Sequence, residues 1–332
     1  MDAATASRLR SAAVCAGIGA LFKVASTLVE RRRLAREEPA AASLSVCGLQ
    51  LRTKVGDLEH NLGAAEALIL RHRGHDLFVL PELSSPGYGD ETFARKDELA
   101  EDERSGPSFR RFSQVARAVD AYVAYGILRR RRDGSLAISQ AVVGPDGRLV
   151  TCYDKMHLCD MGACSETAKG VARPETPEPC VFECAGVRVG LCICYDLRFP
   201  ELWRRMCWAA DGRERGGDGG DGHAADLVVH PSAFVRDATF PTWHAFVTTR
   251  AVENQVYVLS VSHAGPDFGG SVACPPWVGP VARAAGEPDL ELAPTVPLGD
   301  GEGVVALRVE RAVLAAVREQ FPYRRDARVL PS

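Results

Sequence analysis

The chain has 332 residues, of which 46% are hydrophobic and 25% are charged, and this is typical of a globular protein with a sizeable buried core. Its formal net charge of −3 provides no global positive field for nucleic acid, and no apolar run is long and unbroken enough to span a bilayer. The 11 cysteines are an odd number without regular spacing, which favours free thiols in a reducing compartment over a disulfide framework.

The first 42 residues differ in composition from the rest. Residues 1–29 are rich in alanine and serine and contain Arg8, Arg10 and Lys23 against a single acid, Asp2. Such a segment can form a basic amphipathic helix and resembles an organelle transit peptide, although a dispensable tail would look similar. The protein is therefore expected in the cytoplasm, or in a mitochondrion or plastid if residues 1–42 are a transit peptide, and the folded domain is expected over residues 43–332.

From Leu44 onward, strand-like and helix-like segments alternate, which favours a layered α/β domain. Residues 209–224 are rich in glycine and aspartate, contain almost nothing to bury, and are predicted to form a disordered insertion. Helices are predicted at 57–73, 108–121, 195–205 and 242–255. Strands are predicted at 44–51, 75–83, 122–128, twice within 135–155, and at 188–194, 225–234 and 256–265.

Two cysteines end the segment "RVGLCIC" at residues 188–194. Cys192 lies inside the predicted strand and is interpreted as packing. Cys194 comes at the strand end, directly before a helix-like run, where a thiol can face a cleft beside backbone N–H groups. Those donors favour a thiolate and can hold an oxyanion, so Cys194 is a candidate nucleophile, although spacing alone also allows a buried small hydrophobe.

Three segments resemble the signature regions of the nitrilase superfamily of carbon–nitrogen hydrolases: "FVLPELSSPGYG", "YDKMHLCD" and "CICYDLRFPELWR". The resemblance is greatest to the Nit branch, which includes omega-amidase and deaminated glutathione amidase, and it extends over roughly 44–330. It implies a four-layer αββα sandwich, a homodimer paired through its sheets, and no cofactor. It also implies a catalytic triad of Glu82, Lys155 and Cys194.

The implied reaction explains why these residue types are needed. An amide carbonyl is attacked by a thiolate, so Glu82, at the end of a buried strand, would act as the base that takes the thiol proton. Lys155 and the backbone N–H of Tyr195 would stabilise the tetrahedral oxyanion. Ammonia would leave, and water would hydrolyse the thioester. Without the family motifs, Glu82 could equally cap a turn and Lys155 could be a solvated charge at a strand end.

Arg198 follows the nucleophile by four residues and could bind a substrate carboxylate with its guanidinium fork. The resemblance implies substrates that are omega-amides of small carboxylic acids, such as a 2-oxo acid amide. The ordinary alternative is a structural ion pair with Asp196 or Glu201.

One position departs from the pattern that the resemblance implies. A second glutamate, which orients the lysine, is expected after the strand at 122–128, but residues 129–133 read "RRRRD". Arg129 or a neighbour is therefore expected at that site, with a more positive pocket and a less firmly held Lys155. The alternatives are a catalytically weakened scaffold, or a hydrolase of N-carbamoyl or nitrile substrates, although "YD" follows Cys194 where nitrilases usually have "WE".

No metal site and no nucleic-acid site is predicted. The arginine run lacks interleaved aromatic residues, so a solvated loop is the simpler interpretation. "GGDGGDG" lacks the flanking strand and helix that a phosphate-binding loop requires. The spacings of the possible zinc ligands match no common module, and packing explains these residues better: His157, Cys159, Cys164, Cys180 and Cys184.

Overall fold

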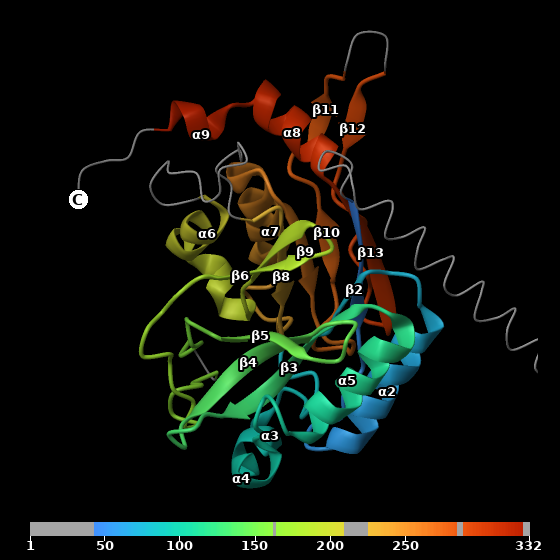
Figure 1. Ribbon diagram of the computed structural model, residues 1–332. Helices are drawn as coiled ribbons and strands as arrows, with labels where there is room; N and C mark the ends of the chain where they lie inside the picture. Colours follow the sequence, from blue (N-terminus) through green and yellow to red (C-terminus); the bar gives the residue numbers. More distant parts are fainter. Residues whose placement is uncertain (1–42, 162–163, 209–224, 284–287, 328–332) are drawn as a thin grey trace, which may run out of the picture. The chain divides into compact units, whose positions relative to one another are not determined.

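The computed structural model describes residues 43–161, 164–208, 225–283 and 288–327. The predicted extension at 1–42 and the predicted insertion at 209–224 lie outside the described residues. From Ser43 onward the chain forms one unit (Figure 1). None of the helices described there has the length and apolar character needed to cross a bilayer.

Two sheets form the centre of this unit. The first has the order β13-β1-β2-β3-β4-β5, with β1, β2 and β3 parallel and the other pairings antiparallel. Its strands are β1 (Ser43–Gln50), β2 (Leu77–Val79), β3 (Tyr122–Arg130), β4 (Leu136–Val143), β5 (Leu149–Asp154) and β13 (Gly303–Glu310).

The second sheet has the order β10-β9-β8-β7-β6, and β7, β8 and β9 are parallel. Its strands are β6 (Cys180–Cys184), β7 (Val187–Leu191), β8 (Leu227–Pro231), β9 (Tyr257–Val261) and β10 (Val272–Cys274). A separate two-stranded sheet pairs β11 (Gly279–Val281) with β12 (Leu290–Leu292).

Helices cover the outer face of each sheet, which gives four layers (Figure 1). Helices α2 (Leu58–Arg71) and α5 (Pro107–Val119) pack on the first sheet, and α6 (Pro200–Cys207) and α7 (Pro241–Asn254) pack on the second. The predicted αββα sandwich is therefore confirmed. The remaining short helices are α3 (Asp90–Ala94), α4 (Lys96–Leu99), the 3₁₀ helix η2 (Cys194–Arg198), α8 (Arg311–Gln320) and α9 (Tyr323–Asp326).

Alternation along the strands produces this layering. In β7, Val189 and Leu191 face the core between the sheets, whereas Cys192, just beyond the strand, faces the core under α6 and α7. Successive side chains of a strand point to opposite faces, so strands apolar on both faces are covered on both faces. The predicted packing role of Cys192 is confirmed.

Several strands are shorter than predicted, and two of them, β2 and β7, end early at places that matter for function. Strand β2 ends at Val79 rather than Leu83, because Pro81 has no N–H to donate to a ladder and Leu83 has a left-handed φ of 46°. Strand β7 ends at Leu191 rather than Cys194, which also has a φ of 46° and begins η2. The chain therefore turns sharply directly after Glu82 in one case and at Cys194 itself in the other.

Candidate active site

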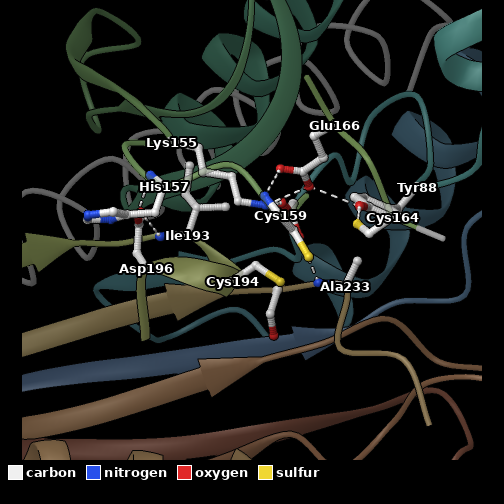
Figure 2. A network of polar contacts seen from close by, with 12 residues as sticks. Tyr88, Lys155, His157, Cys159, Cys164, Glu166, Ile193, Cys194, Asp196 and Ala233 are labelled. Atoms are coloured by element: carbon white, nitrogen blue, oxygen red, sulfur yellow. Dashed lines mark hydrogen bonds and ion pairs between the residues drawn. The ribbon is translucent and has the colours of Figure 1, made fainter. Parts of the chain in front are cut away.

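The ends of three strands bring the predicted triad together. Glu82 follows β2 and Cys194 follows β7, each at the carboxyl end of the parallel part of its sheet, and Lys155 directly follows β5. The carboxyl ends of parallel strands are where α/β folds place their reactive groups, because the loops there diverge from the packed layers. Figure 2 shows Lys155 and Cys194 in one group of polar side chains.

The turn that carries Glu82 lies directly against β3. Ser84 and Ser85 bond to the backbone of Gly126, through Gly126 N to Ser84 Oγ at 2.9 Å and Ser85 N to Gly126 O at 3.0 Å. A Cβ atom at Gly126 would lie 2.3 Å from the backbone nitrogen of Leu83, so only glycine allows this approach. The position of the Glu82 carboxylate is therefore set by close backbone packing.

Lys155 is buried between two carboxylates. Its Nζ lies 2.8 Å from Glu82 Oε1 and 2.7 Å from Glu166 Oε1, and all three side chains are fully buried. The second oxygen of Glu82 accepts the Ala233 N–H at 2.9 Å. Lys155 is thus no solvated strand-end charge, and the side chain of Glu82 does not cap its own turn.

Glu166 is the site residue that sequence reasoning missed. It lies 11 positions after Lys155 and is held by the Cys159 N–H at 2.8 Å and the Tyr88 hydroxyl at 2.9 Å (Figure 2). The available signal was an acid that follows the "YDK" motif within one loop. The expectation that Lys155 lacks an orienting carboxylate is wrong, because Glu166 supplies one.

The expectation for Arg129 is also wrong. Arg129 is part of β3 rather than a loop, and its side chain is only 20% exposed. Its guanidinium bonds Glu103 at 2.9 Å and Asp154 at 3.0 Å, and Asp154 also binds Arg131 at 2.8 Å. Strand alternation explains why Arg129 is not in the site. Asp154 directly precedes Lys155 in an extended segment, so their side chains point to opposite faces of the sheet. Arg129 pairs with Asp154 and therefore lies on the face away from Lys155.

We expect Arg129→Glu to destabilise the protein rather than raise its activity, because it would place a third carboxylate beside Glu103 and Asp154. Breaking a partly buried pair of this kind should cost about 2 kcal/mol. Urea denaturation measures the cost, and the exposed neighbour Arg132→Glu is the matched control. An unchanged denaturation midpoint combined with faster amide hydrolysis would contradict the structural assignment.

Cys194 occupies a strained turn that the side chain of Asp196 holds through the preceding residue, Ile193. The Asp196 carboxylate accepts the Ile193 N–H at 2.9 Å, the Tyr153 hydroxyl at 2.8 Å and the His157 N–H at 2.9 Å, and also contacts His157 Nδ1 at 2.7 Å. A left-handed φ at a non-glycine residue persists only where its surroundings enforce it. This network does so at Cys194.

The electrostatics of the site favour a neutral thiol beside a carboxylate. Burial, reinforced by the charge of Glu82, raises the pKa of the Cys194 thiol well above its ordinary value. Burial also raises the pKa of Glu82, with a further contribution from Glu166. Burial opposes the charge of Lys155, but both carboxylates outweigh it and hold the ammonium pKa well above normal. The thiol therefore needs a base, and Glu82 is the carboxylate that contacts it.

Arg198 is flanked by aromatic rings, and the charge of the guanidinium also acts on Asp237, where it helps to lower the pKa of that carboxyl. Its guanidinium carbon lies 5.8 Å from the ring centre of Tyr195, 5.7 Å from Phe234 and 5.4 Å from Phe246. Neither acid considered above as its ion-pair partner bonds to it within the described residues, and Asp196 is engaged by Ile193, Tyr153 and His157 instead. The structural ion pair is therefore not formed.

The candidate zinc ligands do not gather. His157 binds Asp196 and stacks on Phe199 with ring centres 3.7 Å apart, and Cys184 is buried in the core between the sheets. Cys159 donates its backbone N–H to Glu166 at 2.8 Å, and the Cys164 sulfur lies 3.0 Å from the Tyr88 hydroxyl. In the part of the chain that the structure describes, no three such ligands converge on one point.

Known proteins resemble this chain over most of its length. The sequence profile of a family described as Carbon-nitrogen hydrolase matches residues 44–295. Omega-amidase NIT2 of Xenopus tropicalis is 31% identical over 280 residues, which cover 81% of this chain and 89% of that protein.

Solved structures share the fold. A CN-hydrolase superfamily protein from Xanthomonas campestris, with an arsenic adduct in its active site, has a TM-score of 0.70 at 25% identity and covers 87% of this chain and 99% of its own. Nit3 of Saccharomyces cerevisiae, a member of branch 10 of the nitrilase superfamily, has a TM-score of 0.66 at 21% identity, with 86% and 97% covered.

Proposed function

Because this chain belongs to the carbon–nitrogen hydrolase family and is an amidase, we propose that it releases ammonia from an omega-amide of a small carboxylic acid through a cysteine thioester. The observation that carries the proposal is the buried Glu82–Lys155–Glu166 group beside the strained Cys194.

In the first half-reaction, Cys194 Sγ forms a bond to the amide carbonyl carbon while Glu82 takes the thiol proton. The carbonyl oxygen becomes an oxyanion, which the Lys155 ammonium and the Tyr195 N–H stabilise. The intermediate collapses as the C–N bond breaks, and Glu82 returns its proton to the nitrogen. Ammonia leaves, and the acyl group remains as a thioester on Cys194.

In the second half-reaction, Glu82 removes a proton from water and the hydroxide attacks the thioester carbonyl. The C–S bond breaks, the thiolate regains its proton from Glu82, and the carboxylic acid product leaves. The same donors stabilise both oxyanions, so one base and one ammonium serve both steps. Glu166 keeps Lys155 in place between the steps, because it binds Nζ whether or not Glu82 is protonated.

Arg198 supports a substrate that carries a carboxylate. The Arg198 guanidinium is flanked by Tyr195, Phe234 and Phe246, and among the described residues no carboxylate forms a hydrogen bond or close ion pair with its fork. The name omega-amidase, which the NIT2 relatives carry, fits an acid that bears a terminal amide. Ammonia release from acidic amides, neutral amides, N-carbamoyl compounds and nitriles, measured side by side, tests this choice.

Arg198→Ala should raise KM for acidic amides by about 10-fold or more and change KM for neutral amides of equal length by less than about 3-fold. The reason is that only the acidic substrate loses a charge-assisted hydrogen bond. Arg198→Lys keeps the positive charge but lacks the guanidinium fork, so its KM for acidic amides should lie between those of the wild type and Arg198→Ala. Equal effects on both substrate classes would exclude a carboxylate site at Arg198.

Two further expectations belong to this proposal. Pairing of two copies through their sheets is implied by the family, and light scattering on the purified chain tests it. A catalytically weakened scaffold is the second candidate function. Labelling of Cys194 by a thiol reagent without turnover of any amide in the panel would favour that scaffold.

A further inference from the structure

A chain of three buried side chains ends on the backbone of the nucleophile. Trp243 Nε1 lies 2.9 Å from Ser260 Oγ, Ser260 Oγ lies 2.7 Å from His230 Nδ1, and His230 Nε2 lies 2.9 Å from the carbonyl oxygen of Cys194. All three side chains are fully buried, and they come from β8, β9 and α7. None of them belongs to the proposed triad.

The chemistry of the two ends, together with a neutral His230, determines the direction of every hydrogen bond in this chain. An indole nitrogen can only donate and a carbonyl oxygen can only accept. Trp243 therefore donates to Ser260, Ser260 donates to His230 Nδ1, and His230 Nε2–H donates to Cys194. His230 must be neutral to accept at Nδ1, and burial lowers its pKa to about 4, which keeps it neutral at physiological pH.

The carbonyl that His230 holds belongs to the same peptide unit as the Tyr195 N–H. In a trans peptide the C=O and the N–H share one rigid plane and point in opposite directions. A donor that fixes the Cys194 carbonyl therefore also fixes the direction of the Tyr195 N–H. Among the described residues no acceptor bonds to that N–H, so it is available to a substrate oxygen.

We propose that His230 is a positioning residue, which orients the Cys194–Tyr195 peptide so that the Tyr195 N–H donates to the oxyanion. A hydrogen bond to the carbonyl also polarises the peptide and makes its N–H a stronger donor. Ser260 and Trp243 act through His230: the Ser260 hydroxyl donates to Nδ1, which places the ring proton on Nε2. This inference rests on the proposed function, since it assigns a role in stabilising the oxyanion formed at Cys194.

The backbone of Cys194 is strained, and the hydrogen bond from His230 stabilises that conformation. With a φ of 46°, Cys194 lies in a region that non-glycine residues rarely adopt, and relaxation of that strain would rotate the following peptide. Asp196 anchors the Ile193 N–H on the other side of the nucleophile. His230 provides the hydrogen bond to the peptide that follows Cys194, and a loss of that bond would free the Tyr195 N–H from its direction.

The test compares two reactions of the same sulfur. Amide hydrolysis passes through an oxyanion, whereas alkylation of Cys194 by iodoacetamide is a displacement at a saturated carbon and forms none. His230→Leu removes the donor, and His230→Gln restores an N–H donor as the conservative rescue. His75→Leu is the matched control, because His75 Nδ1 also bonds a serine hydroxyl, that of Ser45 at 2.7 Å, but lies before β2 at the end away from Glu82.

We expect His230→Leu to lower kcat by about 10-fold to 100-fold, with KM and the alkylation rate changed by less than about 3-fold. His230→Gln should recover most of the lost kcat, and His75→Leu should leave it unchanged. If His230→Leu does not fold, Ser260→Ala supplies the same test, with an expected loss of about 3-fold to 10-fold in kcat because the tautomer is no longer selected.

Two outcomes would overturn the inference. An unchanged kcat in His230→Leu, or in Ser260→Ala if the former does not fold, would show that the peptide needs no such support. A parallel fall of kcat and alkylation rate would show that the thiol itself moved and that His230 is only structural. Cys194→Ala distinguishes a failure of this inference from a failure of the proposed function. If Cys194→Ala still hydrolyses amides, the proposed function fails. If Cys194→Ala is inactive while His230→Leu is fully active, only the inference about His230 fails.

Discussion

Replacing Cys194 by alanine is expected to lower the rate of amide hydrolysis by at least about 10⁴-fold, because the thioester can no longer form. The change removes one sulfur from a partly buried turn that Asp196 and His230 hold from both sides, so the variant should stay folded. Single-turnover mass spectrometry of the wild type should show an acyl group on Cys194. Hydrolysis at the wild-type rate in Cys194→Ala would require another nucleophile.

Cys192 provides the matched control two positions away. It is fully buried under α6 and α7 and points to the opposite side of the second sheet from the core between the sheets. Cys192→Ala should lower the free energy of unfolding by about 1 kcal/mol through the small cavity that it leaves. Its kcat should remain within about 3-fold of wild type. An acyl adduct on Cys192 instead of Cys194 would contradict the assignment.

Glu82→Gln is the second substitution with a large expected effect, a loss of about 10²-fold to 10⁴-fold in kcat/KM. Glutamine keeps the shape of the side chain and can still accept the Ala233 N–H, but it cannot take the thiol proton. Circular dichroism should show an unchanged fold. A wild-type rate in Glu82→Gln would place the base elsewhere.

The pH profile identifies the base more directly. A base works only when deprotonated, so activity should fall as the pH falls through the pKa of Glu82. Burial and the charge of Glu166 raise that pKa, so the acid limb should lie above the ordinary range near pH 4. In Glu82→Gln this limb should vanish.

Glu166→Gln is the matched control for Glu82→Gln, because it also removes one carboxylate from Lys155 but leaves the base in place. Loss of the negative charge at Glu166 should lower the pKa of Glu82 and move the acid limb to lower pH. An acid limb that disappears in Glu166→Gln and persists in Glu82→Gln would assign the base to Glu166 instead.

The layered fold could be predicted from the sequence because each strand carries its own burial pattern. The apolar runs that became β1, β3, β8 and β9 are covered on both faces, and the runs that became α2 and α7 have helical spacing. Alternation within one strand also separated Cys192 from Cys194. The ends of β2 and β7 were less predictable. Leu83 and Cys194, which follow these strands, have left-handed conformations, and neither leucine nor cysteine is a residue type that usually adopts them.

The sequence by itself determined the family, the layering, and Glu82, Lys155 and Cys194 as candidates, since local periodicity and short motifs carry that information. Only the tertiary structure decided which side chains reach them. In the structure Glu166 binds Lys155, and His230 of β8 binds the Cys194 carbonyl. Arg129 pairs with Glu103 and Asp154 instead of lying in the site. The physical reason is that hydrogen bonds between separate elements depend on how two sheets stack and where loops turn. A one-dimensional pattern records which face of its own strand a side chain occupies, but not its partner across the sandwich.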